Sequence, residues 1–168
     1  LLLNFLLENK NKSLSLKFFI GWLFGVGYFF SNTYWIVFSL TFEEIFKPLI
    51  PFALILIPSF LALFYGLATL LILSLKIEKN LSSILIFSLI FSLIEFFRGF
   101  ILGGFPWNLI VYSWTNYTYF IQSLSLIGTY TFNLLSISIF LLPFVLLLNK
   151  NLKYKLKTFF ILIIILLT

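Results

Sequence analysis

The chain has 168 residues, of which 62% are hydrophobic and 10% are charged, and its formal net charge is +6. Because a soluble domain of this length needs a polar surface, so small a charged fraction excludes a soluble globular fold. The sequence has no cysteine, histidine or methionine. This excludes a thiol nucleophile, histidine-based catalysis and haem ligation by these side chains, and we expect no metal site and no cofactor.

Apolar residues gather in runs long enough to cross a bilayer, which takes about 20 residues of helix. We predict an all-α integral membrane protein, a polytopic helix bundle of about four complete transmembrane helices with partial helices at both ends. A single transmembrane domain then covers residues 1–168, and residues 1–8 end an earlier helix. The complete spans and the start of another are predicted at residues 18–40, 48–75, 81–102, 118–148 and 158–168.

Both ends of the sequence indicate part of a longer protein. The chain starts with Leu1 rather than methionine, and Thr168 stands inside an apolar run. We therefore expect the natural product to continue beyond this chain.

Glycines in the first complete span favour close helix packing. Gly21 and Gly25 are four residues apart, so they share one face of a helix and allow another helix to approach it. We expect this face to pack against a neighbouring span.

Lysines distinguish the two sides of the membrane. Loop 9–17 has three lysines, loop 76–80 has two and loop 149–157 has four. Loops 41–47 and 103–117 have one lysine between them. Under the positive-inside rule, these two loops face the outside and the three lysine-rich loops face the cytoplasm. The net charge is then mostly a topology signal, and we predict no nucleic-acid binding.

Glu95 and Arg98 are the only Asp, Glu, Lys or Arg residues within a predicted complete span. A charge at the centre of a membrane helix costs about 2.5–3.5 kcal/mol on insertion scales. The two residues stand at i and i+3, so they share a face and can pair. One interpretation is a structural ion pair that orients the end of the helix. The other is that Arg98 offers its guanidinium to a lipid phosphate at the outer interface.

The segment after that helix is rich in glycine, proline and aromatic residues. It contains Gly103-Gly104-Phe105-Pro106-Trp107-Asn108, a composition that disfavours a continuous helix. One interpretation is an interfacial turn with Trp107 in the aromatic belt. The other is an aromatic groove at the outer leaflet, because Glu95 and Arg98 precede the segment and Tyr112 follows.

Several motifs occur in an order typical of one family of membrane enzymes. The most specific are Glu95-Phe96-Phe97-Arg98-Gly99 and, shortly after it, Gly104-Phe105-Pro106-Trp107. Weaker matches are Gly21-Trp22, Gly25-Val26-Gly27-Tyr28-Phe29, Tyr34-Trp35-Ile36, Tyr112-Ser113, Gln122, Gly128 and Phe132-Asn133-Leu134-Leu135. Over about residues 16–168, the chain resembles the N-terminal membrane region of the apolipoprotein N-acyltransferase family.

This resemblance implies an activity for the whole protein. Members of the family transfer an acyl chain from a membrane phospholipid to the N-terminal diacylglyceryl-cysteine of a lipoprotein, in lipoprotein maturation. The chemistry belongs to an external nitrilase-like domain, whose cysteine acts in a Glu-Lys-Cys triad and forms a thioester acyl-enzyme. That domain is absent from these residues, so we expect this chain alone to be inactive. Its partners would be membrane phospholipid and, through the missing domain, the lipoprotein N-terminus.

The resemblance assigns no catalytic residue to this chain, but it implies a lipid-access groove. The groove candidates are Phe105, Pro106, Trp107, Arg98 and Tyr112. We expect the three residues of the Phe-Pro-Trp motif to contact the external domain or acyl chains, with Glu95 and Arg98 bracing their loop. The chain itself would supply membrane anchoring and lipid access.

Two other functions stay open on the sequence. One is a catalytically inert membrane fragment, which downstream sequence would distinguish from part of an enzyme. The other is a small membrane transporter or lipid-binding protein, which a flux assay in liposomes would detect. A transporter is disfavoured because a transport path usually has ionisable residues at mid-depth, where this chain is almost wholly apolar.

Overall fold

The computed structural model describes residues 2–9, 11–75, 77–78, 80–144 and 160. All of the regular structure within these residues is helical, which confirms the all-α class. The predicted cytoplasmic loop 149–157 and, apart from Phe160, the predicted partial span 158–168 lie outside the described residues.

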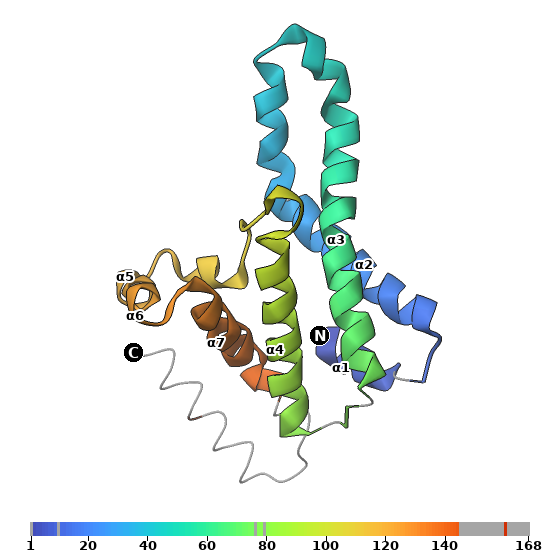
Figure 1. Cartoon of the computed structure of the whole chain (residues 1–168), viewed down its shortest axis with the longest axis vertical. Coiled ribbons are helices and arrows are strands. Elements are labelled where there is room, and N and C mark those ends of the chain that lie inside the picture. Colours follow the sequence, from blue (N-terminus) through green and yellow to red (C-terminus); the bar gives the residue numbers. More distant parts are fainter. Residues whose placement is uncertain (1, 10, 76, 79, 145–159, 161–168) are drawn as a thin grey trace.

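A long hairpin of two antiparallel helices dominates the molecule (Figure 1). Its first arm is α2 (Leu14–Thr33), which continues as the 3₁₀ helix η1 (Tyr34–Thr41). Its second arm begins with the 3₁₀ helix η2 (Glu44–Leu49) and continues as α3 (Ile50–Ser74). Both arms, Leu14–Thr41 and Glu44–Ser74, are long and apolar enough to cross a membrane. The number of spans, about four, stays a prediction.

Glycines bring the two arms together, as expected. A Cβ atom added at Gly21 would collide with the Thr69 side chain, and one at Gly25 would lie 2.9 Å from the Cα of Ala62. Trp22 adds a hydrogen bond across the same interface, because its indole N–H donates to the Ser59 carbonyl at 2.9 Å. The small-residue face therefore sets the spacing of the hairpin.

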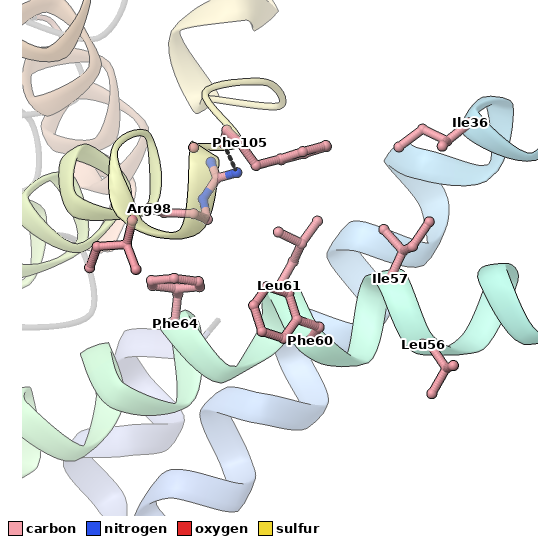
Figure 2. A pocket seen from close by; sticks show the side chains of 10 residues that line it. Ile36, Leu56, Ile57, Phe60, Leu61, Phe64, Arg98 and Phe105 are labelled. Atoms are coloured by element: carbon pink, nitrogen blue, oxygen red, sulfur yellow. Dashed lines mark hydrogen bonds between the residues drawn. The ribbon is translucent and has the colours of Figure 1, made fainter. Parts of the chain in front are cut away.

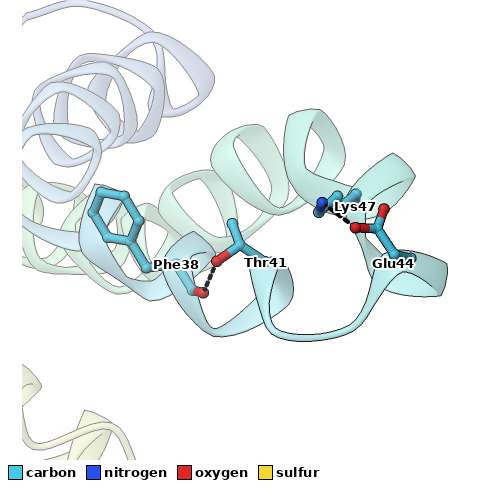
Figure 3. Close-up of polar contacts among 4 residues, drawn as sticks. All are labelled: Phe38, Thr41, Glu44 and Lys47. Carbon is cyan, nitrogen blue, oxygen red and sulfur yellow. Dashed lines mark hydrogen bonds and ion pairs between the residues drawn. The ribbon is translucent and has the colours of Figure 1, made fainter.

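The tip of the hairpin combines local polar contacts with exposed apolar side chains (Figure 3). The Thr41 hydroxyl donates to the Phe38 carbonyl at 2.7 Å, and Lys47 pairs with Glu44 at 2.5 Å. Phe42 next to them is 86% exposed. The polar contacts hold the turn together, whereas the Phe42 side chain packs against little of the described chain.

The helix that carries Glu95 and Arg98 is α4 (Leu81–Arg98), which packs against α3 and α7. It begins at Asn80, whose side chain accepts from the Ser83 N–H at 3.3 Å as an N-cap. The α-helix ends at Arg98, before the predicted limit at residue 102. A short 3₁₀ helix, η3 (Ile101–Gly103), follows, and Gly103 and Gly104 then adopt φ of 87° and 76°. Such values suit glycine and turn the chain away from the helix axis.

The last predicted complete span, 118–148, is not one continuous helix in its described part. It consists of α5 (Thr118–Gln122), α6 (Leu124–Ile127), α7 (Thr129–Leu141) and η5 (Leu142–Phe144). Gly128 separates α6 from α7 with φ 79° and ψ 157°, a conformation that no helix can contain. Gly128 therefore interrupts the helix in this segment, while a membrane span over residues 118–148 stays a prediction.

The buried core lies where α1 (Leu2–Glu8), the middle of the hairpin, α4 and α7 meet (Figure 1). Its centre is aromatic, because Tyr65 packs on Phe91, Phe29 and Tyr28 with ring centroids 5.0–5.5 Å apart. The Glu95 and Arg98 side chains lie beside these rings.

Candidate functional site

Glu95 is completely buried and joins three helices. One carboxylate oxygen accepts from the Tyr65 hydroxyl of α3 at 2.7 Å. The other accepts from the side-chain N–H of Asn133 on α7. Because Tyr65 and Asn133 belong to different helices, these two hydrogen bonds fix α4 against both neighbours. With both oxygens occupied, Glu95 serves as a structural connection rather than as a free acid or base.

Arg98 is 1% exposed and holds the loop that follows α4. Its Nη1 donates to the Phe105 carbonyl at 2.7 Å and to the Trp107 carbonyl at 3.1 Å. Its guanidinium also lies between two aromatic rings, with Cζ 5.1 Å from the centroid of Phe29 and 5.8 Å from that of Phe105. Arg98 thereby connects the loop to the hairpin by both hydrogen bonds and cation–π contacts.

The direct ion pair expected between Glu95 and Arg98 is not seen. Within the part of the chain that the structure describes, the pair closer than 4.0 Å joins Lys47 to Glu44. Glu95 instead contacts α3 and α7, whereas Arg98 extends toward the loop. The i, i+3 spacing places both residues on a similar face of α4. Their side chains nevertheless bind different groups, Glu95 on the neighbouring helices and Arg98 on the loop.

Three further contacts position the loop that carries the Gly-Phe-Pro-Trp motif. The Tyr28 hydroxyl donates to the Asn108 carbonyl at 2.8 Å, and Asn108 itself has φ 58°. Trp107 packs on Trp35 of η1, with ring centroids 5.1 Å apart. The side-chain amide oxygen of Asn133 accepts from the N–H of Val111 at 2.9 Å, so the residue that binds Glu95 also holds a later part of the loop.

A cavity of about 450 Å³ lies between the hairpin and this loop (Figure 2). Arg98 and Phe105 line it from one side. Apolar side chains of the hairpin line the other side, namely Ile36, Leu56, Ile57, Phe60, Leu61 and Phe64. The arrangement puts one buried cation at the edge of an apolar chamber, which suits a ligand with an anionic group and a hydrocarbon part.

A second cavity, of about 360 Å³, is lined by later residues of the same loop. Tyr28, Asn32, Asn108 and Tyr112 are among the side chains that line it. Burial raises the pKa of the Tyr112 phenol above its ordinary value, so this group is protonated at neutral pH and can donate a hydrogen bond. This cavity is the more polar counterpart of the first.

The five predicted groove residues therefore do not share one site. Arg98 and Phe105 meet at the first cavity, and Tyr112 lines the second. Pro106 is exposed, and Trp107 is 50% exposed and packs on both Trp35 and Phe105. Their predicted roles toward lipid remain predictions.

Sequence reasoning missed Tyr65 as part of the site. It is 1% exposed and contacts Glu95 through its hydroxyl. A tyrosine in the middle of an apolar span was the available signal, because a buried phenol needs a hydrogen-bond partner. Among the described residues, no group of three or more acidic, cysteine or histidine side chains could hold a metal ion.

The family model described as the apolipoprotein N-acyltransferase N-terminal domain matches residues 1–142. This match covers more than half of the chain and includes both arms of the hairpin, α4 and the loop. The chain belongs to the apolipoprotein N-acyltransferase family. The recognised family is therefore the one that the motifs around Arg98 and Trp107 indicated.

Curated relatives agree with the family. The apolipoprotein N-acyltransferase of Brucella melitensis biotype 1 is 39% identical over 125 residues, which are 74% of this chain and 23% of that protein. Those of Rhodopseudomonas palustris and Allorhizobium ampelinum are 39% and 35% identical over 75% and 79% of this chain, and 24% and 25% of their own length. The chain thus spans about a quarter of the relatives it matches. No solved structure matches it.

Proposed function

We propose that this chain is the membrane-embedded N-terminal part of an apolipoprotein N-acyltransferase. The whole protein would transfer an acyl chain from a phospholipid to the N-terminal diacylglyceryl-cysteine of lipoproteins. The observation that carries the proposal is the family match over residues 1–142. Because the 168 residues contain no cysteine, the thiol that the resemblance implies would come from outside them.

Anchoring in the inner membrane is the first role that we propose for this chain. Its hairpin arms have 28 and 31 residues, or roughly 42 Å and more at 1.5 Å per residue, which exceeds a hydrocarbon core of about 30 Å. Large apolar side chains also stay exposed along the helices, as at Phe52, Ile55 and Leu85, which are 61–64% exposed. Lipid chains are a suitable environment for this surface.

Lipid access is the second proposed role. The cavity beside Arg98 has apolar walls, and several side chains at its edge are exposed, including Leu56 at 63% and Ile101 at 47%. A lipid can approach such a cavity sideways from the bilayer. Arg98, Tyr28 and Asn133 hold the neighbouring loop in a fixed position, and we propose that this loop faces the outer leaflet and the external catalytic domain.

A chimaera tests this function. Residues 1–168 would replace the matching region of the Brucella melitensis relative, and membranes containing the chimaera would receive a diacylglyceryl-cysteine peptide. We expect mass spectrometry to detect the peptide with one additional acyl chain. The unaltered relative is the positive control, and the relative without its matching region is the negative control.

A correctly inserted chimaera that forms no more acylated peptide than the negative control would contradict the proposal. That outcome would favour the catalytically inert membrane fragment instead.

A further inference from the structure

Arg98 has hydrogen-bonding capacity that the described structure leaves unused. Its Nε and Nη2 are buried and have no hydrogen-bond partner, whereas its Nη1 binds two loop carbonyls. Buried donors without acceptors are costly, and nearly all of them in native proteins find partners. In a chain embedded in lipid, a buried cation with free donors indicates a functional site whose partner is missing.

The two free nitrogens define which kind of partner fits. The N–H of Nε and one N–H of Nη2 point from the same edge of the planar guanidinium. This edge binds two oxygen atoms of one anion at once, as in bidentate contacts to phosphate or carboxylate. The acceptor is therefore an anion with at least two oxygens, rather than a single carbonyl.

The cavity next to Arg98 defines what the anion is attached to. Figure 2 shows Arg98 on one side of the cavity, opposite apolar side chains of α3 that include Leu61 and Phe64. Its volume of about 450 Å³ exceeds what a small anion needs, and a free anion would gain nothing from such walls. Exposed apolar side chains at the edge, such as Phe60 at 46%, leave the cavity open toward the surrounding lipid.

The Phe105 side chain lies beside the guanidinium of Arg98. Its ring lies 5.8 Å from the guanidinium carbon and lines the cavity. Because Nε and Nη2 are themselves buried, an anion reaches them after a neighbouring side chain moves, and Phe105 is one such neighbour. The backbone of Phe105 need not move, since its carbonyl binds the other guanidinium nitrogen.

We infer that the free edge of Arg98 binds the phosphate diester of a membrane phospholipid, while one acyl chain of that lipid occupies the apolar cavity between α3, η1 and the loop. The phosphate diester is the anion that a bilayer supplies already attached to hydrocarbon chains. This inference rests on the proposed function insofar as the bound phospholipid would be the acyl donor. It makes Arg98 the residue that selects phospholipid over uncharged diacyl lipid.

Lipid binding by the full-length protein in a neutral detergent tests the inference without requiring turnover. The probes are fluorescent phosphatidylethanolamine and a diacylglycerol with identical chains, and the readout is the ratio of their dissociation constants. We expect the unaltered protein to prefer the phospholipid by about tenfold or more, because two charge-assisted hydrogen bonds are at stake. Arg98→Gln should abolish this preference, whereas Lys47→Gln, which removes an exposed cation, should preserve it.

A second pair of variants keeps Arg98 and its loop contacts intact. Ile57 lines the cavity, so Ile57→Trp should fill it and weaken the binding of both lipids by about tenfold. Ile55, two residues away on the same helix, is 64% exposed, and Ile55→Trp should have no effect. This pair decides the outcome if Arg98→Gln fails to fold.

Three results would overturn the inference. The first is a preference for phospholipid that survives in Arg98→Gln. The second is equal binding by the Ile57→Trp and Ile55→Trp variants. The third is displacement of the phospholipid by inorganic phosphate at equal concentration, which would make the site one for a bare anion. This assay measures binding and not acyl transfer. An inactive chimaera would therefore not contradict a measured lipid preference, and a missing lipid preference would not contradict an active chimaera.

Discussion

Glu95 and Arg98 are both buried charges on α4, but their surroundings differ. Glu95 accepts one hydrogen bond on each carboxylate oxygen, from Tyr65 and from Asn133. Arg98 keeps two nitrogens without a partner beside a cavity. Glu95 therefore holds the helices together and Arg98 holds the loop, and in our proposal Arg98 also binds a ligand.

Removing the phenol hydroxyl that binds Glu95 should destabilise the helix bundle. We expect Tyr65→Phe to lower the free energy of unfolding by about 1–3 kcal/mol, because a buried carboxylate oxygen then lacks its donor. The measurement is unfolding in a mixed-detergent titration, followed by circular dichroism. Tyr34→Phe is the matched control, since the Tyr34 side chain is 56% exposed and should lose little. Equal stabilities for the two variants would show that the Tyr65–Glu95 contact contributes nothing.

The sequence singled out Glu95 and Arg98, but it did not predict the hydrogen-bond partners of Glu95. The motif spacing placed Arg98 near Phe105, and the two do meet. The partners of Glu95 lie 30 and 38 positions away in sequence, on α3 and α7, so only the packing of helices could reveal them. Tyr112 lines another cavity, whose lining shares no residue with the cavity beside Arg98.

Glycines of α2 set the distance between α2 and α3 in the hairpin. Gly25 faces Ala62 closely, whereas Gly27 has nothing within 4 Å of the position a Cβ would take. Replacing each of these glycines of α2 by alanine therefore distinguishes the effect of interhelical packing on stability from the effect of helix propensity.

We expect Gly25→Ala to destabilise the hairpin by about 1–3 kcal/mol, because the new methyl group would overpack the interface with α3. Gly27→Ala should be neutral or stabilising by up to about 1 kcal/mol, since alanine has the higher helix propensity. Unfolding of both variants in the same detergent titration gives the comparison. If Gly25→Ala were as stable as Gly27→Ala, the close approach of the two helices would be incorrect.

The composition of the apolar runs was enough to predict helices. It was not enough to predict where a helix is interrupted. The apolar runs predicted helices throughout, and all regular structure within the described residues is helical. The interruption at Gly128 was missed because its flanking residues are apolar and helix-compatible, so the pattern resembles one long span. The positive φ of that glycine, rather than hydropathy, ends the helix there.

The whole molecule places the loop after α4 beside the middle of a much longer hairpin. α4 has 18 residues, or about 27 Å, whereas each hairpin arm has at least 28. The tip of the hairpin consequently extends well past the end of α4 (Figure 1). In our proposal, this geometry gives Arg98 access to lipid on one side and to the external domain on the other.

We propose that the chain crosses the inner membrane and presents residues 103–117 on its outer face. The most direct test is to label single cysteines in intact cells with an impermeant thiol reagent, with the unsubstituted protein as background. Asn116→Cys lies in that loop and Asn11→Cys lies in the predicted cytoplasmic loop 9–17, and both positions are exposed. We predict labelling of Asn116→Cys in intact cells and of Asn11→Cys only after lysis. The reverse pattern, or equal labelling of both variants before lysis, would contradict this topology.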